Sequence, residues 1–354
     1  MDRGEGVMKR LSMCMFGLLA IILCAGCGSD EAADQKDKAS VATVKDQELE
    51  RVKNMFQPLS DMAIPADNEM TKEKEELGKR LYFDARLSGN NKLSCMSCHA
   101  PGAGYGDNLE TFIGFEGFKG SRNSPTIINA GYYDSYFWDG RASSLEEQAL
   151  GPIQAAGEMN QNLDELITEL HAVPEYVEEF ETVFDDKITA SNIAKALAAF
   201  ERTIVVKDTA FDKYLLGDED AISDDAKDGM KLFAGKAGCI SCHAGAFLTD
   251  QSYHNLGMEN DDGRFAVTNK EEDKGKFRTP GLRGITHTAP YMHDGSLETL
   301  DEVVAYYNSG GGTHVNKSDL VFPLDLTSEE MKSLVAFLET LGGELPAVDT
   351  PEIY

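Results

Sequence analysis

Two five-residue stretches decide the fold of this chain: Cys95-Met96-Ser97-Cys98-His99 and Cys239-Ile240-Ser241-Cys242-His243. Each has the spacing C-x-x-C-H, in which both sulfurs can bond to the vinyl groups of a haem while the adjacent histidine ligates the iron. A structural zinc site would place its two Cys pairs about 15–20 residues apart, but these motifs begin 144 residues apart. Neither motif lies in the βαβ pattern of a thioredoxin-like redox pair. The sequence therefore predicts two covalently bound c-type haems, ligated by His99 and His243.

The three remaining cysteines lie within residues 1–27, which read as a signal peptide. Lys9 and Arg10 precede an apolar stretch, 11–25, that is too short to span a bilayer. The run Ala-Gly-Cys ending at Cys27 resembles a bacterial lipoprotein cleavage site, and an ordinary signal peptide is the alternative. Both kinds of leader predict an exported, periplasmic protein. The lipoprotein leader would also tether the protein to a membrane through a lipid on Cys27.

Charge and length limit the other possibilities. The 354 residues carry a formal net charge of −28, which argues against a nucleic-acid partner. The same charge could steer a basic redox partner or simply be a solvated surface. After a polar stretch at 28–57 that reads as a flexible tether, the remaining length suggests two domains.

An internal duplication supports this division. In each half an apolar helical stretch leads into C-x-x-C-H. Residues 122–125 (Arg-Asn-Ser-Pro) are then followed, thirteen residues after the proline, by Trp-Asp-Gly at 138–140. The second half repeats the order with Arg-Thr-Pro at 278–280 and His-Asp-Gly at 293–295. We therefore expect an N-terminal cytochrome c domain at 58–210 and a C-terminal one at 211–345.

Alternating strand patterns are scarce, so the predicted fold class is all-α, with long haem-wrapping loops. Helical patterns cover about 161–183 and 190–206, and a polar connector is expected near 207–222. A last helix is predicted to follow the capping box formed by Thr327 and Glu330.

The function of a haem depends on the sixth position of its iron. Met159 lies 60 residues after His99, a spacing that suits the ligand of an electron carrier. Its neighbour Glu158 could instead move the proton that peroxide cleavage requires. The residues alone leave both interpretations open.

From about residue 70 to 342 the chain resembles the bacterial dihaem cytochrome c peroxidase family. The matching segments are residues 122–126 (RNSPT), 137–141 (FWDGR), 147–149 (EQA), 151–155 (GPIQA), 158–159 (EM) and 288–291 (TAPY). In that family the N-terminal haem is peroxidatic and the C-terminal haem passes electrons. The resemblance implies Glu158 as acid–base residue, Gln148 as hydrogen-bonding group beside it and Trp138 as a relay between the haems.

The resemblance also implies a calcium ion between the domains. Its ligands would be the side chain of Asn123 and the carbonyl oxygens of Thr288 and Pro290, an all-oxygen set that suits calcium. Trp138 as a core aromatic residue and Asn123 as a turn residue are the structural alternatives.

The chain departs from the family pattern at two positions. Many members carry a histidine that blocks the peroxidatic iron, where this chain has Phe115, which cannot ligate. Glu116 could ligate, although a solvated glutamate is the simpler reading. The second haem usually takes a methionine, where this chain has Tyr307, as in the dihaem enzyme that matures the tryptophan tryptophylquinone cofactor.

The alternatives at the second haem are Tyr307 as a packing residue and Met258 or Met292 as ligand. A phenolate ligand favours ferric iron and should lower the potential. The histidines at 254, 287, 293 and 314 are expected to be loop residues or propionate contacts, not ligands.

These observations predict an exported dihaem peroxidase that reduces hydrogen peroxide to water. A small cytochrome or cupredoxin is the expected electron donor, and a homodimer is a further expected assembly. The alternatives are a maturase-like oxidase acting on a protein side chain and, if Met159 ligates iron, a plain dihaem electron carrier.

Overall fold

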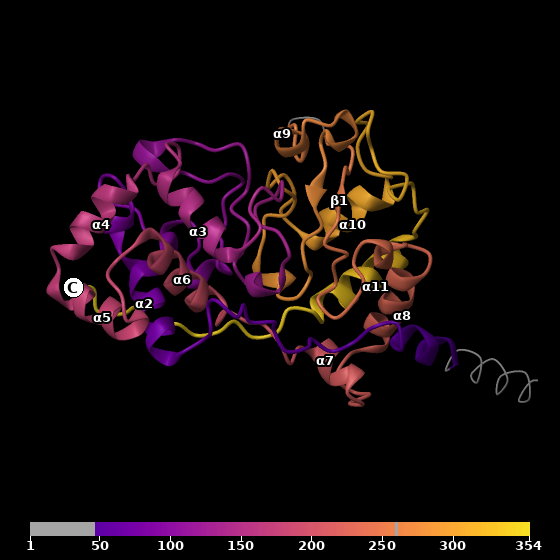
Figure 1. Cartoon of the computed structure of the whole chain (residues 1–354). Coiled ribbons are helices and arrows are strands. Elements are labelled where there is room, and N and C mark those ends of the chain that lie inside the picture. The colour runs from indigo at the N-terminus through magenta and orange to yellow at the C-terminus, as the bar shows by residue number, and fades with distance from the viewer. Residues whose placement is uncertain (1–46, 259–260) are drawn as a thin grey trace, which may run out of the picture. The chain divides into compact units, whose positions relative to one another are not determined.

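A computed structural model describes residues 47–258 and 261–354, of which Leu49–Tyr354 form one compact unit (Figure 1). The predicted signal peptide and the acylation site at Cys27 lie outside the described residues, as does most of the predicted tether. Among the residues described, no helix is both long and apolar enough to span a membrane.

The expected all-α class is confirmed. In the described ranges, helical residues at 47–53 are followed by α2 (Lys72–Phe83), α3 (Leu145–Gln154), α4 (Leu163–His171), α5 (Pro174–Phe184), α6 (Ala190–Glu201), α7 (Ala210–Leu215), α8 (Asp224–Ala234), α9 (Phe265–Thr268), α10 (Leu300–Asn308) and α11 (Ser328–Glu339). Short 3-10 turns lie at Ala85–Leu87, Cys95–Ser97, Pro101–Ala103, Phe115–Gly117, Ala130–Tyr132, Cys239–Ser241, Glu271–Asp273 and Ile285–His287. The only named strands in the described ranges, β1 (Tyr253–His254) and β2 (Phe277–Arg278), form one short antiparallel pair.

The duplication seen in the sequence is a repeated helix crossing. In the first half α2 packs on α6 at Gly78, where an added Cβ would lie 1.8 Å from the carbonyl oxygen of Ala196. In the second half α8 packs on α11 at Gly229, where an added Cβ would lie 1.8 Å from the carbonyl oxygen of Ser333. Glycine is therefore required at both crossings, because any side chain would push the helices apart.

A second repeated element is the turn after each haem motif. Phe137 and Met292, at equivalent positions, both have a positive φ, of 65° and 73°. Isolated bridges close the two turns, pairing Tyr136 with Ala142 and Tyr291 with Leu297. This left-handed backbone is uncommon outside glycine, so its recurrence shows that both halves need the same loop shape beside their motif.

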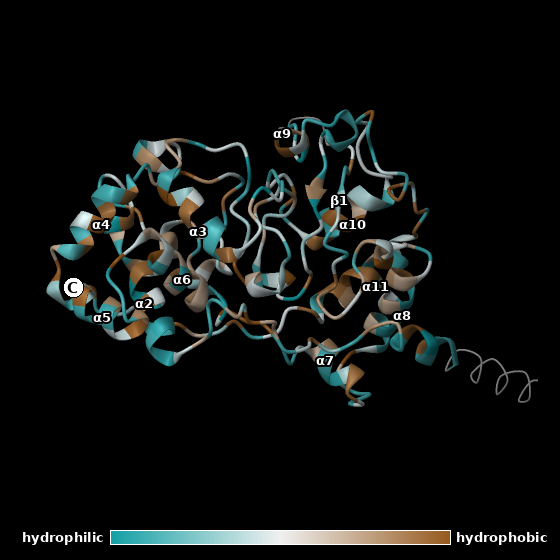
Figure 2. Cartoon of the chain, in the orientation of Figure 1, coloured by the Kyte–Doolittle hydropathy of each residue, from teal (hydrophilic) through white to brown (hydrophobic). Residues whose placement is uncertain are grey.

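Each half has its own buried core. Most helices in Figure 2 carry hydrophobic residues on one side and hydrophilic residues on the other, as expected for helices that cover a core. The predicted capping box of the last helix is present: Thr327 accepts from the backbone N–H of Glu330 at 3.2 Å, and the Glu330 carboxylate accepts from the backbone N–H of Thr327 at 2.8 Å. The helical patterns at 161–183 and 190–206 correspond to α4, α5 and α6.

Two expected segments differ from the structure. The connector near 207–222 contains α7, whose Phe211 and Tyr214 are fully buried. The predicted tether, 28–57, ends earlier than expected, because Val52 and Phe56 are buried in the core of the C-terminal half. Phe56 contacts Phe211 edge-on at 5.2 Å between ring centroids. In both segments polar and charged residues surround a few large apolar ones, which is why the sequence predicts polar connections there.

The chain ends cross between the halves. The segment around Phe56 packs on the C-terminal core, whereas Leu345, Val348 and Tyr354 pack on the N-terminal core. In Figure 1 the indigo segment runs along α8 toward α2, and the yellow segment leaves α11 and ends near α5. We call the segment 343–354 the C-terminal strap.

Candidate functional site

His99 lies on a cavity of the N-terminal half, here called the N-terminal cavity, together with Cys95 and Cys98. Its Nδ1 is 3.3 Å from the carbonyl oxygen of Tyr105. Because a carbonyl can only accept, this nitrogen carries the proton, and Nε2 keeps its lone pair for a metal. Burial lowers the pKa of His99, which keeps the ring neutral.

The C-terminal cavity repeats this arrangement with Cys239, Cys242 and His243. The Nδ1 of His243 is 3.0 Å from the carbonyl oxygen of Leu248, and burial lowers the pKa of this ring too. Burial raises the pKa of Cys98 and of Cys242 to about 11, so both are protonated thiols at neutral pH.

The residues present fit a c-type haem in each cavity. Four free thiols sit in pairs beside two neutral, oriented imidazoles, and most of the other lining side chains are apolar. An apolar slot with two thiols and one histidine suits a flat, covalently held macrocycle. The cluster of Cys242, Asp250 and His254 could in principle hold a metal ion, but Cys242 belongs to the haem motif.

The structure brings Gln148 and Glu158 to the N-terminal cavity beside His99. Gln148 lies on α3, and Glu158 follows the end of that helix in a turn closed by its backbone N–H bonding to Ala155. Burial raises the pKa of Glu158, although the positive charge of Arg141 opposes this shift. A carboxyl with a raised pKa in a cavity is suited both to accept and to return a proton.

Met159 lines the same cavity and is buried in the core of the N-terminal half. Its backbone N–H donates to Pro152, and its carbonyl accepts from Gly89. The geometry therefore leaves both candidate residues, Glu158 and Met159, at the cavity.

Trp138 lines both cavities, as do Asn123 and Pro125. The indole Nε1 of Trp138 donates to the carbonyl oxygen of Asn123 at 2.9 Å. This hydrogen bond orients the ring where it lines both cavities. A side chain in this position can connect the two sites.

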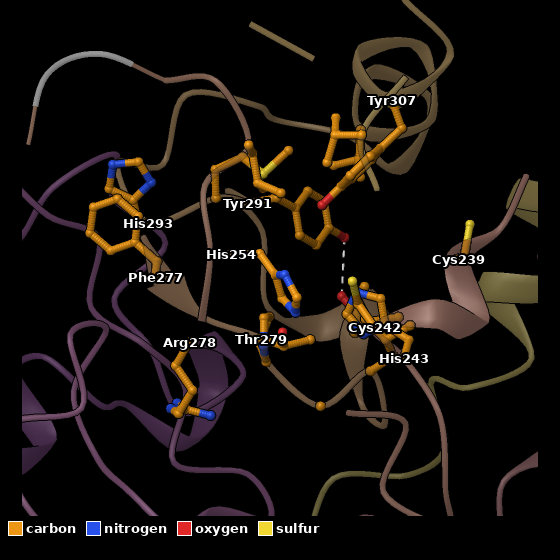
Figure 3. Close-up of a pocket in the computed structure, with 18 of the residues that line it drawn as sticks. Cys239, Cys242, His243, His254, Phe277, Arg278, Thr279, Tyr291, His293 and Tyr307 are labelled. Atoms are coloured by element: carbon orange, nitrogen blue, oxygen red, sulfur yellow. Dashed lines mark hydrogen bonds between the residues drawn. The ribbon is translucent and has the colours of Figure 1, made fainter. Parts of the chain in front are cut away.

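Tyr307, on α10, is directed into the C-terminal cavity from the side opposite Cys242 and His243 (Figure 3). Burial strongly disfavours its phenolate and raises the pKa of Tyr307 well above its ordinary value. A buried phenolate needs a compensating positive charge, which a ferric iron would supply. Met258 and Met292, the two methionines considered as alternative ligands, line the same cavity.

The histidines are held by other contacts. His254 pairs with Asp250 at 2.7 Å, and His293 stacks on Phe277 at 3.6 Å between ring centroids. The Nε2 of His287 lies 3.0 Å from the carbonyl of Gly343, and His314 contacts Asn255.

The three residues expected to bind calcium all line the C-terminal cavity: Asn123, Thr288 and Pro290. The side-chain nitrogen of Asn123 donates to the carbonyl of Leu109 at 2.8 Å. This contact orients the amide and leaves its oxygen available as a ligand, so the donor set fits calcium.

Residues 112–120 form the loop in which a blocking histidine is expected from the family pattern. Backbone contacts hold this loop beside the N-terminal cavity. The backbone N–H of Phe115 donates to the carbonyl of Glu158 at 2.8 Å, and a bridge pairs Ile113 with Lys119. Phe112 and Phe118 line the cavity, whereas Phe115 and the exposed Glu116 do not.

Three charged residues near the cavities were not predicted as functional. Arg122 joins the two halves through a bidentate ion pair with Asp261. Its Nε donates to Oδ2 at 2.7 Å, and its Nη2 donates to Oδ1 at 2.8 Å. Arg141 and Glu201 line the N-terminal cavity. The only available signal for Glu201 was an acidic residue that ends a run of apolar helix positions, a pattern that also describes surface helices.

Comparisons with known proteins agree with this geometry. The family model described as di-haem cytochrome c peroxidase matches residues 72–220, and the cytochrome c model matches residues 226–342. Cytochrome-c peroxidase IdrP1 of Denitromonas iodatirespirans is 42% identical over 335 residues, covering 84% of this chain and 89% of the relative. Methylamine utilization protein MauG of Methylorubrum extorquens is 40% identical over 335 residues, covering 92% and 95%.

A crystal structure of a MauG-like protein associated with microbial copper homeostasis superposes with a TM-score of 0.74 and 34% identity. That similarity covers 80% of this chain and 93% of the other. The matches extend over both halves and both C-x-x-C-H motifs. This chain therefore belongs to the di-haem cytochrome c peroxidase family, with one c-type haem in each of its two cytochrome c-type domains.

Proposed function

We propose that this protein reduces hydrogen peroxide to water, with electrons from a small redox protein. The observation that carries the proposal is the N-terminal cavity, where Glu158 and Gln148 lie together with the ligand His99. The reaction consumes two electrons and two protons for each peroxide and yields two water molecules. The match to the family model described as di-haem cytochrome c peroxidase and the relatives named cytochrome-c peroxidase support it.

The haem held by His99 supplies the iron on which peroxide binds and is reduced. Glu158 takes the proton from the oxygen that attacks and returns it to the oxygen that leaves. Gln148 holds the peroxide by hydrogen bonding. Met159 is better placed as a packing residue, because it is buried in the core of the N-terminal half.

Trp138 passes electrons between the two haems, a role supported by its place in the lining of both cavities. Tyr307 ligates the iron of the C-terminal haem, a role supported by its burial and direction in that cavity. Asn123 with the carbonyls of Thr288 and Pro290 binds calcium. We propose further that the chain is exported to the periplasm, because haem is attached to C-x-x-C-H outside the bacterial cytoplasm. We also propose that it is lipid-anchored through Cys27, because the run Ala-Gly-Cys that ends there resembles a lipoprotein cleavage site.

A second candidate function is oxidation of a protein side chain. The specific observation in its favour is Tyr307, which replaces the usual methionine, together with the similarity to MauG. Because Glu158, Gln148 and Trp138 would serve both reactions, the site alone does not distinguish them.

Steady-state kinetics on the two-haem protein tests the proposal. Intact mass should first show two haem additions. We expect sustained peroxide consumption with a reduced small cytochrome as donor, and a high-spin ferric signal in the resting protein by electron paramagnetic resonance. Absence of turnover with every small donor, despite a high-spin signal, favours the side-chain oxidase. A resting protein with two low-spin haems contradicts both enzymes and favours the electron carrier.

A further inference from the structure

Glu201 is a buried acid on the wall of the N-terminal cavity that the proposed reaction does not use. It is the last residue of α6, is 6% exposed, and lies among apolar lining residues such as Leu197 and Ile153. Its Oε2 has no hydrogen-bond partner among the described residues. An unpaired carboxyl group in such a place is energetically unfavourable, so its presence calls for a physical explanation.

The neighbouring arginine does not neutralise Glu201. Arg202 directs its two terminal nitrogens to Glu146, at 2.7 and 3.2 Å. The Nε of Arg202 is itself buried without a partner in the described structure. The positive charge of Arg202 stabilises ionised Glu201, whereas Glu146 opposes ionisation.

Three further titratable groups that interact electrostatically with Glu201 are neutral at physiological pH. They are the phenols of Tyr82 and Tyr136 and the sulfur of Cys95. Burial raises the pKa of each phenol, and Cys95 becomes an uncharged thioether once haem is attached. Because these three neighbours stay neutral, they would not offset a change of charge on a haem in this cavity.

We propose that Glu201 is a redox-linked proton site of the N-terminal haem. Oxidation of a haem bound in this cavity would transfer one electron to a one-electron redox mediator and would leave one additional positive charge beside the carboxyl. The O–H bond of Glu201 then breaks, and its proton leaves to solvent. Reduction reverses both changes, so one proton accompanies one electron.

The direction in which the reduction potential should change with pH follows from electrostatics in a low-dielectric cavity. Desolvation raises the pKa of Glu201 to about 8, and the haem that fills the cavity excludes water further. An added positive charge lowers a carboxyl pKa, and its effect is strong where water is absent. Between the pKa of Glu201 in the oxidised form and that in the reduced form, the reduction potential should fall as pH rises.

Spectroelectrochemical titration of the two-haem protein tests this inference between pH 6 and 9. We expect the potential of the N-terminal haem to fall with pH, approaching one proton per electron around pH 8. Glu201→Gln should make that potential independent of pH. A pH-independent wild type, or an unchanged slope in Glu201→Gln, overturns the proposal.

Glu158→Gln is the matched control, because Glu158 is the other acid on the same cavity with a raised pKa. The slope around pH 8 should persist in this variant, and its loss would assign the proton to Glu158 and overturn the proposal. If Glu201→Gln does not fold, the redox infrared difference spectrum of Glu158→Gln decides. A carboxylic C=O band must disappear on oxidation, and an unchanged carboxyl region contradicts the proposal.

The inference rests on the proposed function only for the haem at His99. No peroxide enters these experiments, so a pH-independent potential leaves the peroxidase proposal intact. Equally, a protein that fails to reduce peroxide could still show the proton-coupled potential.

Discussion

At the residue scale, the proposed chemistry depends on where water is excluded. Glu158 and Glu201 line the same cavity, and burial raises the pKa of both. Glu158 also faces the guanidinium of Arg141, which favours its ionised form. The two acids are therefore suited to different roles. Glu158 is proposed to exchange a proton with bound peroxide, while Glu201 is proposed to gain or lose a proton when the charge of the haem changes.

Replacing Glu158 by Gln should reduce peroxide turnover by about 10²–10⁴-fold, the usual contribution of a general acid–base group. Gln keeps the shape but cannot accept and return a proton. Since burial raises the pKa of Glu158, wild-type turnover should fall as pH drops through that raised pKa and Glu158 becomes protonated. Steady-state assays across pH, on protein with both haems confirmed by mass, measure both effects.

Met159→Leu is the control for the neighbouring residue. It keeps an apolar side chain of similar volume, so turnover should stay within a few-fold of wild type. Glu158→Gln with near-normal turnover, or Met159→Leu with a lost low-spin signal, would show that the methionine is the functional group.

Tyr307→Met should raise the reduction potential of the C-terminal haem, because a thioether stabilises ferrous iron and a phenolate stabilises ferric iron. The variant should also gain the weak near-infrared sulfur-to-iron band of methionine ligation. Tyr306→Phe, one position away, should leave the potential unchanged, because the Tyr306 hydroxyl donates instead to the carbonyl of Leu256. A wild-type protein that already has the sulfur band would identify Met258 or Met292 as the ligand.

At the element scale, the sequence predicts those parts of the fold that repeat or have a period. The amphipathic patterns locate α4, α5 and α6, and the capping box locates the start of α11. The two C-x-x-C-H motifs predict both cavities, because haem attachment needs that spacing. The pattern does not reveal α7, which has six residues. The burial of Glu201 is also hidden, because it depends on packing between segments far apart in the chain.

The loop at 112–120 should leave the N-terminal site open in the fully oxidised protein. Phe115 cannot ligate, and its backbone is held by Glu158 at 2.8 Å. Ferric protein mixed with peroxide in a stopped-flow instrument should therefore change its spectrum without prior reduction. A wild-type protein that reacts only after reduction would contradict this account.

The repeated helix crossing should not tolerate even one methyl group. Gly229→Ala places a Cβ against the carbonyl of Ser333, at 1.8 Å before any shift. Forcing the helices apart should cost at least about 1–3 kcal/mol, the typical penalty of overpacking. Calorimetric unfolding measures this loss, and Gly102→Ala is the control, because an added Cβ there meets nothing within 4 Å. Equal stability of the two variants would contradict the tight crossing.

At the scale of the whole molecule, the crossed chain ends hold the two halves together. Arg80 donates to the carbonyl of Glu352 at 2.8 Å and packs over the ring of Tyr354 at 4.4 Å. The hydroxyl of Tyr105 donates to the carbonyl of Pro346 at 2.7 Å. Since the carbonyl of Tyr105 faces His99, the C-terminal strap supports the loop that orients the N-terminal haem ligand.

Ending the chain at Gly343 should destabilise the N-terminal half by a few kcal/mol, since a fully buried large apolar side chain contributes about 1.5–3 kcal/mol. The lost contacts include Leu345, Val348 and Tyr354. Thermal unfolding followed at the N-terminal haem should shift to lower temperature. Phe56→Ala should instead shift the C-terminal transition, because Phe56 packs in that core. If truncation leaves the unfolding temperature of the N-terminal half unchanged, the C-terminal strap does not stabilise that half.

The crossed ends also set an order of events during synthesis. A ribosome makes the segment around Phe56 first and the C-terminal strap last, yet each packs on the more distant half of the chain. The N-terminal half, although translated early, therefore lacks part of its core until the C-terminal strap is also present. The first cytochrome fold can close only once the strap packs on it, and the N-terminal half expressed alone lacks the packing that completes it.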